Sequence, residues 1–215
     1  MIGLVLTGCS PSTEKATDPL RATSVTNALA QSNTIQNLDL YDIRLTRFPT
    51  EILTLKNLKQ LNLRTCTIGQ LPDEISVLSQ LTRLDLAQTG LTNLSPAVGQ
   101  LSQLTHLWLN DNPLPSLPRE MAGLTQLTYL NADRTLLREV PQELGLLSNL
   151  KWLRLNNNQL TAMPLDMSGL AKSLKILYLI GNPIPEQEQK RIKDSLPGCE
   201  VIFRVGKPES HNGRS

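Results

Sequence analysis

Large apolar residues recur along this chain with a period of 23 residues, and successive windows share one pattern. In the second window Leu61 and Leu63 alternate with polar residues, which predicts a short strand with one buried face. Further along, Ile75 and Leu78 are three residues apart, a spacing that predicts a 3₁₀ or short helical segment. The windows open at Ile35, Leu58, Leu81, Leu104, Leu127, Leu150 and Leu174.

A fixed period of this length is typical of a solenoid, in which no unit can bury its apolar face without a neighbour. We therefore expect the strands of successive windows to pair in parallel and to line a concave face. The returning segments line the opposite, convex face. Because the convex side is wider than the strand side, the stack should curve.

The pattern reads Leu-x-x-Leu-x-Leu-x-x-Asn/Cys/Thr-x-Leu-x-x-Leu-Pro-x-x-Ile/Met/Leu-x-x-Leu. It resembles the leucine-rich repeat family, in the 23-residue Leu-Pro form common in bacterial and Ras-binding members, and the resemblance covers residues 24–203. The resemblance implies an α/β solenoid: a leucine-rich repeat arc with a parallel β-sheet on the concave face and 3₁₀ or short helices on the convex face. About seven repeats would occupy residues 35–184.

The segments that flank the repeats differ from them in pattern. Residues 22–34 predict a helical cap, because Val25 and Leu29 fall at the helical positions of a half repeat. Residues 185–205 predict a C-terminal cap, in which a helix with acidic residues first and basic residues last suits the helix dipole. The polar tail, 206–215, is expected to be disordered.

The first residues predict a membrane anchor. The sequence Leu6-Thr7-Gly8-Cys9 resembles the bacterial lipobox, which implies that residues 1–8 are the remnant of a lipoprotein signal and that the Cys9 thiol takes a lipid. Buried lipid methylenes stabilise such an anchor by about 0.8 kcal/mol each. The Ser/Thr/Pro-containing stretch 9–21 would then be a tether. The alternative is a chance Thr-Gly-Cys near a terminus.

Two details refine the anchor hypothesis. The apolar run before Cys9 is shorter than the usual ~7–15 residues and no basic residue precedes it, so we expect the natural start codon further upstream. Ser10 follows the cysteine where an Asp would favour the inner membrane, by resemblance to enteric lipoproteins. The expected location is therefore the bacterial cell envelope, in the outer membrane rather than the inner.

The other two cysteines, Cys66 and Cys199, are expected to be free and buried. Cys66 stands at the ninth repeat position, which Asn112, Asn158 and Asn182 fill elsewhere and whose side chain caps the turn. More than five repeats separate the two thiols, which at about 4.8 Å per strand puts them beyond disulfide reach.

Motifs for catalysis, metal or phosphate binding are absent from the sequence. There are two histidines, and no His-Glu-x-x-His, Cys-x-x-Cys, Gly-x-Ser-x-Gly or glycine-rich phosphate loop occurs. We therefore expect no enzyme activity, no cofactor and no metal. The net charge is +2 with Lys and Arg spread along the chain, which argues against a nucleic-acid partner.

The aromatic residues are the most informative side chains. The chain has two Trp, three Tyr and two Phe. Phe48 and Phe203 fall at core positions, whereas every Tyr and Trp falls at an outward position on the concave face. Those five are Tyr41, Trp108, Tyr129, Trp152 and Tyr178.

The repeat spacing also predicts neighbours. Tyr129 and Trp152 should lie opposite one another on adjacent strands, close enough to stack, with Trp108 diagonal to Tyr129. Tyr, Trp and Arg are enriched in binding hot spots. Two interpretations stay open: a binding groove, or aromatic side chains that merely cover a sheet. The candidate ligand-binding residues are His106, Trp108, Tyr129, Asn131, Trp152, Arg154 and Tyr178.

The sequence thus predicts a monomeric, lipid-anchored binding module with a concave surface for a protein or peptide. One alternative is a carbohydrate or peptidoglycan fragment stacked on the aromatic rings. Another is a purely structural envelope lipoprotein.

Overall fold

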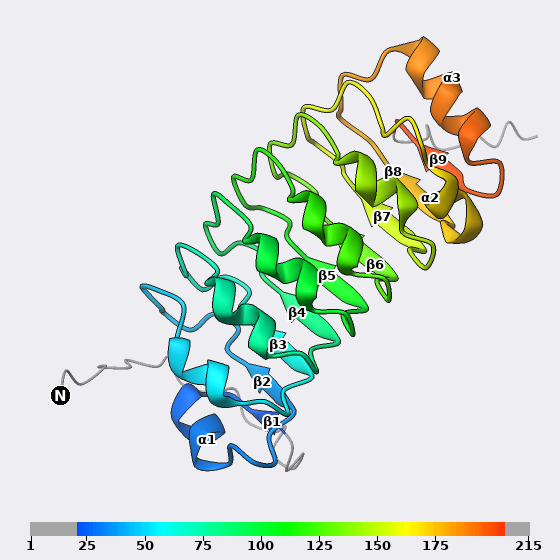
Figure 1. The fold of residues 1–215 in the computed structure, drawn as a ribbon. Coiled ribbons are helices and arrows are strands. Elements are labelled where there is room, and N and C mark those ends of the chain that lie inside the picture. The colour runs from blue at the N-terminus through cyan, green and yellow to red at the C-terminus, as the bar shows by residue number, and fades with distance from the viewer. Residues whose placement is uncertain (1–20, 205–215) are drawn as a thin grey trace, which may run out of the picture.

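The structure, a computed structural model, describes residues 21–204 as one repetitive arc. Nine strands form one parallel sheet in sequence order, β1 to β9. The strands lie along one side of the stack and the helical segments along the other (Figure 1). The predicted fold class, a leucine-rich repeat arc, is confirmed.

The strands are short, and each pairs with the equivalent residues one repeat away. In β3 and β4, for example, Leu61 is the Cα partner of Leu84. The central residue of each repeat strand is buried and its two neighbours face the concave side, as in β6, where Leu130 is 0% exposed. The strands are β1 (Arg21–Ala22), β2 (Asn37–Asp39), β3 (Gln60–Asn62), β4 (Arg83–Asp85), β5 (His106–Trp108), β6 (Tyr129–Asn131), β7 (Trp152–Arg154), β8 (Ile176–Tyr178) and β9 (Glu200–Ile202).

The convex side carries one short helix per repeat. Most of these are 3₁₀ helices that begin directly after a proline, whose fixed φ suits the residue before a helix start. The sixth repeat has one extra residue and forms a turn of α-helix instead. The segments are η1 (Thr50–Thr54), η2 (Asp73–Val77), η3 (Pro96–Gln100), η4 (Arg119–Gly123), η5 (Gln142–Leu146) and α2 (Ser168–Ser173).

The two ends of the sheet are covered. The expected N-terminal helix is α1 (Val25–Ala30), capped by the Ser24 hydroxyl, which accepts from the Asn27 N–H at 3.1 Å. It begins later than the sequence indicates because β1 precedes it and pairs with β2. At the other end α3 (Glu186–Ser195) buries Ile192 before β9 adds the last strand. Within residues 21–204 no helix has the length and apolar character to cross a bilayer.

The two cysteines of residues 21–204 differ in burial. Cys66 is fully buried and its thiol donates to the Leu40 carbonyl, as expected of a turn cap. Cys199 is only partly buried, so the expectation of two buried thiols is wrong for it, because it lies in the turn before β9, at the end of the stack. Burial raises the pKa of both thiols to about 11. Cys9, the proposed tether and the C-terminal tail lie outside the described residues.

Glycines let the convex segments touch through their backbones. A Cβ at Gly99, in η3, would lie 2.0 Å from the Glu120 carbonyl oxygen of η4. A Cβ at Gly123 would lie 2.3 Å from the Gly99 carbonyl oxygen. With strands fixed about 4.8 Å apart, the spacing of the convex segments determines how strongly the arc curves. These glycines therefore shape the concave surface from the opposite side.

We expect Gly99→Ala to destabilise the protein by about 1–3 kcal/mol, because the new methyl group has no room beside the Glu120 carbonyl. Gly198→Ala is the matched control, since a Cβ there meets nothing within 4 Å. Denaturant unfolding of the full chain, monitored by circular dichroism, measures both. Equal midpoints for the two variants would contradict the close approach of η3 and η4.

Candidate ligand-binding surface

The outward residues of the strands form two rows across the concave face. The predicted site residues all lie on these rows, and the parallel pairing places them on consecutive strands. The first row is Asn37, Gln60, Arg83, His106, Tyr129, Trp152 and Ile176. The second row is Asp39, Asn62, Asp85, Trp108, Asn131, Arg154 and Tyr178.

Tyr41 is an exception to the predicted placement. It was assigned to an outward strand position, but β2 ends at Asp39 and Tyr41 lies beyond it with 56% of its surface exposed. The strands are only three residues long, so a position two residues further on already belongs to the turn. Tyr41 is therefore not part of the aromatic surface.

Three rings form one compact group, which we call the aromatic cluster: His106, Trp108 and Tyr129. The Trp108 and Tyr129 ring centroids are 5.3 Å apart, as their diagonal placement predicts. His106 stacks on both, with centroid distances of 5.6 Å and 5.9 Å. The Arg83 guanidinium lies over the Trp108 ring, 4.9 Å from its centroid. The cluster rings thus pack against one another and are only partly exposed.

Trp152 stands apart from the aromatic cluster. It is the Cα partner of Tyr129, as predicted, but among residues 21–204 the two rings do not stack. The Tyr129 ring packs on His106 and Trp108 instead, on the side of the preceding strand. Trp152 is 40% exposed, more than any other strand aromatic among residues 21–204. It offers an open indole surface beside a packed cluster.

Arg154 is held by Asp133, in the turn after β6, and by Tyr178 of β8. Its guanidinium donates to Asp133 Oδ2 at 2.9 Å and lies over the Tyr178 ring, 4.9 Å from the centroid. Asp133 is buried, and its other oxygen accepts from the Asn156 N–H at 2.7 Å. Asn131 caps the turn after β6, since its side chain accepts from the Asp133 N–H at 3.0 Å. These residues form a fixed rim beside Trp152.

Trp108 interrupts a regular system of turn caps. In most repeats a second-row Asp or Asn accepts the backbone N–H two residues further on, as Asp85 does for Ala87 at 2.9 Å. Where the second row carries Arg154 or Tyr178, a buried Asp or Asn of the preceding repeat accepts the N–H instead. The acceptors concerned are Asp39, Asn62, Asp85, Asn131, Asp133 and Asn156.

Neither kind of cap exists after Trp108. Among residues 21–204 the Asn110 N–H finds no acceptor, and the buried Oδ1 of Asn110 finds no donor. The Asn110 amide nitrogen donates to Asp111 Oδ2 at 2.7 Å, which fixes the orientation of the amide. A buried unsatisfied polar group costs about 1–3 kcal/mol. An indole at this position is therefore unfavourable for the local turn.

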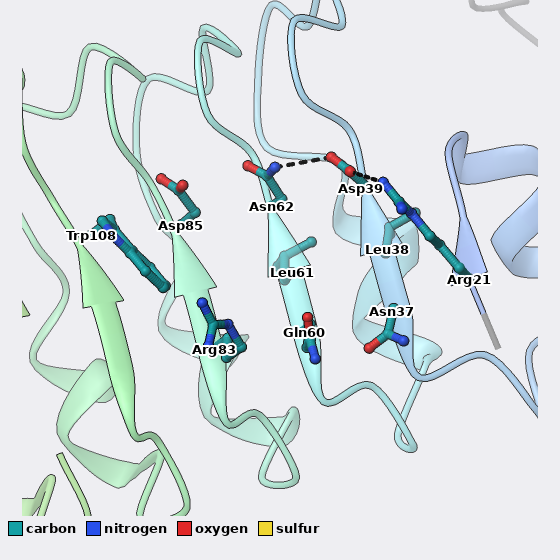
Figure 2. Close-up of a pocket in the computed structure, with 10 residues that line it drawn as sticks. All are labelled: Arg21, Asn37, Leu38, Asp39, Gln60, Leu61, Asn62, Arg83, Asp85 and Trp108. Atoms are coloured by element: carbon teal, nitrogen blue, oxygen red, sulfur yellow. Dashed lines mark hydrogen bonds and ion pairs between the residues drawn. The ribbon is translucent and has the colours of Figure 1, made fainter. Parts of the chain in front are cut away.

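A polar pocket in the N-terminal half of the concave face was not predicted. Its volume is about 370 Å³, and it runs from β1 to β5, ending at Trp108 (Figure 2). Asp39 is paired with Arg21 and accepts from the Asn62 amide at 2.9 Å. Asn and Gln side chains have no distinctive motif, so the sequence alone gave no reason to select them. The lining residues are Arg21, Asn37, Leu38, Asp39, Gln60, Leu61, Asn62, Arg83, Asp85 and Trp108.

The partly buried charges of this surface have shifted pKa values. Burial raises the pKa of Asp85 above its ordinary value. Burial, and then the positive charge of Arg83, lower the pKa of His106. The His106 Nδ1 is within 2.9 Å of the Thr105 hydroxyl. Both effects favour the neutral form of the imidazole next to Trp108.

The titration of His106 tests this geometry. We expect its pKa below 6.5, and partly restored in Arg83→Gln, because burial remains while the charge is gone. The unfolded state then binds the proton first, so the free energy of unfolding should fall as the pH drops from 6.5 towards the folded-state pKa. Proton NMR of the imidazole, assigned with His106→Gln, measures the shift. A wild-type pKa at or above 6.5 would contradict the packed cluster.

The comparisons with known proteins agree with the repeat fold. A family model described as a leucine-rich repeat region matches residues 28–128. A leucine-rich repeat protein of Leptospira interrogans is similar at 38% identity and a TM-score of 0.77, over 79% of this chain and 43% of that one. No curated protein matches the sequence.

Two further solved structures are similar. A plant peptide hormone receptor, RGFR1, in complex with RGF2, matches at 26% identity and a TM-score of 0.71, over 86% of this chain and 30% of the receptor. An internalin of Listeria monocytogenes matches at 20% identity and a TM-score of 0.72, over 86% of this chain and 52% of that one, and supports the fold alone. The chain thus spans about half or less of the length of these three proteins. Together with the nine-stranded parallel sheet, the matches identify the chain as a leucine-rich repeat protein.

Proposed function

We propose that the concave face binds an extended peptide segment of a protein partner, with Trp152 at the centre of the contact. The observation that carries this proposal is the open indole of Trp152, 40% exposed on a surface where the other strand aromatics are packed. An exposed Trp beside Tyr and Arg is the composition typical of an interface hot spot.

The surroundings of Trp152 favour binding because they are already ordered. Tyr129 is fixed by the aromatic cluster, and Arg154 is fixed by Asp133 and Tyr178. A partner that docks here does not have to immobilise these side chains, a cost of about 0.5–1.5 kcal/mol for each one otherwise. The three-residue strands, paired on both sides, keep the backbone in place.

Trp108 argues against the interpretation that the aromatics merely cover the sheet. An Asp or Asn at its position would accept the backbone N–H two residues further on, as Asp85 and Asn131 do in the adjacent repeats. Trp108 instead leaves the Asn110 backbone N–H without an acceptor among residues 21–204. A residue that leaves a turn uncapped lowers local stability, and such a residue is typical of a functional surface.

A peptide ligand is also consistent with one similar structure. RGFR1, 26% identical over the matched region, is a peptide hormone receptor in complex with RGF2. A glycan stacked across several rings is less well supported, because Arg83 lies over Trp108 and the cluster rings face one another. Among the strand aromatics of residues 21–204, Trp152 has the most open ring for a sugar, and glycan binding is therefore an outcome that the experiment distinguishes.

The test uses a displayed library of random twelve-residue peptides, selected on the immobilised full chain. A selected peptide should bind Trp152→Ala about 30-fold more weakly, as expected for a loss of about 2 kcal/mol at a hot spot. The melting temperature should change little, because the ring is outside the core. Tyr41→Ala, an exposed aromatic beyond the strands, is the control and should bind within about threefold of wild type.

Two results would overturn the peptide proposal. One is the absence of any enriched peptide, and the other is unchanged affinity in Trp152→Ala. Binding of soluble glycans that Trp152→Ala abolishes, with no peptide enriched, would favour the carbohydrate alternative. Absence of both kinds of ligand would favour a structural envelope protein.

We also propose that the protein is anchored to the bacterial envelope through a lipid on Cys9. The support is the sequence Leu6-Thr7-Gly8-Cys9 and the Ser10 that follows, all outside the described residues. With the change made at the chromosomal locus, Cys9→Ala should abolish labelling by radioactive palmitate and release the protein from the membrane fraction. Cys66→Ala, which removes a buried thiol, is the control for labelling. Full labelling of Cys9→Ala would refute the anchor.

A further inference from the structure

The first row changes character between the two halves of the concave face. From β2 to β4 it carries Asn37, Gln60 and Arg83, and none of these side chains has a hydrogen bond or ion pair within residues 21–204. From β6 to β8 the same row is apolar, with Trp152 at its middle. A ligand that follows this row across the strands meets unpaired polar groups first and an open indole later.

Arg83 is an unpaired cation of this surface. Arg21 and Arg154 are each paired with a carboxylate, whereas Arg64, whose charge also acts on Asp85, has no ion pair within residues 21–204. Arg83 lies over the Trp108 ring, 4.9 Å from its centroid. A stacked guanidinium keeps its in-plane N–H donors free, and two of these can form a bidentate pair of hydrogen bonds with a carboxylate. Trp108 therefore orients the Arg83 guanidinium, and a carboxylate of a ligand can bind its free N–H groups.

The separation of Arg83 and Trp152 determines the spacing of ligand groups. They occupy the same row on β4 and β7, three strand spacings apart, or about 14 Å at about 4.8 Å per spacing. An extended peptide advances about 3.4 Å per residue and alternates its side chains, so residues i and i+4 face the same side about 13.6 Å apart. The two distances agree to within about 1 Å.

We propose that the ligand is an extended peptide segment lying across the strands, with an Asp or Glu side chain on Arg83 and an aromatic or large aliphatic side chain four residues away on Trp152. This inference rests on the proposed function and gives its ligand a defined chemistry. The residue midway between the two lies over the aromatic cluster, whose rings pack against one another.

Neighbouring acidic groups restrict the anion to a single carboxylate. Asp85 lies two residues after Arg83 on the same strand and forms no ion pair within the described part of the chain. Asp39 lines the same pocket and is already paired with Arg21 (Figure 2). A polyanion at Arg83 would lie close to these carboxylates and be repelled, whereas one Asp or Glu side chain meets only the guanidinium fork.

The experiment compares the peptides selected on three forms of the full chain. Wild type should enrich peptides with Asp or Glu four positions from Trp, Tyr, Phe or Leu. Arg83→Glu should enrich Lys or Arg at that acidic position and keep the apolar position. Arg119→Glu, a matched charge reversal on the convex helix η4, should select the same peptides as wild type.

A double-mutant cycle makes the test independent of any change in protein folding. In a selected peptide, Glu→Gln should weaken binding to wild type at least tenfold, and weaken binding to Arg83→Gln less than threefold. The peptide change leaves the protein untouched, so the first measurement reports on the ligand alone.

The outcomes separate the two proposals. Peptides that need Trp152 but show no acidic residue at this spacing overturn the inference and leave the proposed function in place. The same holds if Glu→Gln has equal effects on both proteins. A selection that enriches no peptide, or peptides that bind Trp152→Ala as well as wild type, overturns both.

Discussion

The repeat stack depends on buried side-chain hydrogen bonds that join the turn of one repeat to the next. Asn112 Oδ1 accepts from the Thr89 N–H at 3.0 Å and the Leu91 N–H at 3.1 Å, and its amide nitrogen donates to the Leu86 and Leu109 carbonyls at 2.7 Å and 2.8 Å. No strand of residues 21–204 has more than three residues, so the ladder alone satisfies few backbone groups. Without these caps the turns would bury unpaired N–H and C=O groups.

In the middle of the stack the turn caps alternate between Thr and Asn. The hydroxyls of Thr89 and Thr135 each lie within hydrogen-bond distance of a carbonyl in their own turn and of the Asn of the following repeat, at 3.1 Å and 3.0 Å from its Oδ1. Thr–Asn pairs therefore join repeats two by two in the middle of the stack. This buried, satisfied network fixes the register of the strands, and hence which residues face the concave side.

The arc and its two rows were predictable from the sequence because one spacing determines both. Apolar positions 23 residues apart place equivalent residues on paired strands, so Tyr129 opposite Trp152 followed directly. The direction in which each ring turns was not predictable, because it depends on the side chains of both neighbouring strands. Tyr129 packs on Trp108 rather than Trp152 for this reason.

Tyr41 and Cys199 were misplaced because strand ends and stack ends do not follow the repeat average. The polar pocket was missed because its amide side chains lack a motif.

The convex face sets the curvature of the arc, and the concave face presents the candidate ligand-binding residues. On the convex side Gly99 and Gly123 allow backbone contact between adjacent helices, which sets the spacing there. On the concave side the strand spacing is fixed by hydrogen bonds, so the distance between residues such as Arg83 and Trp152 varies little. A surface of fixed spacing selects ligands by the spacing of their own side chains, and it does so without reordering on binding. The unfavourable turn at Asn110 is then a local cost that a highly regular stack can tolerate, since the flanking repeats hold β5 on both sides.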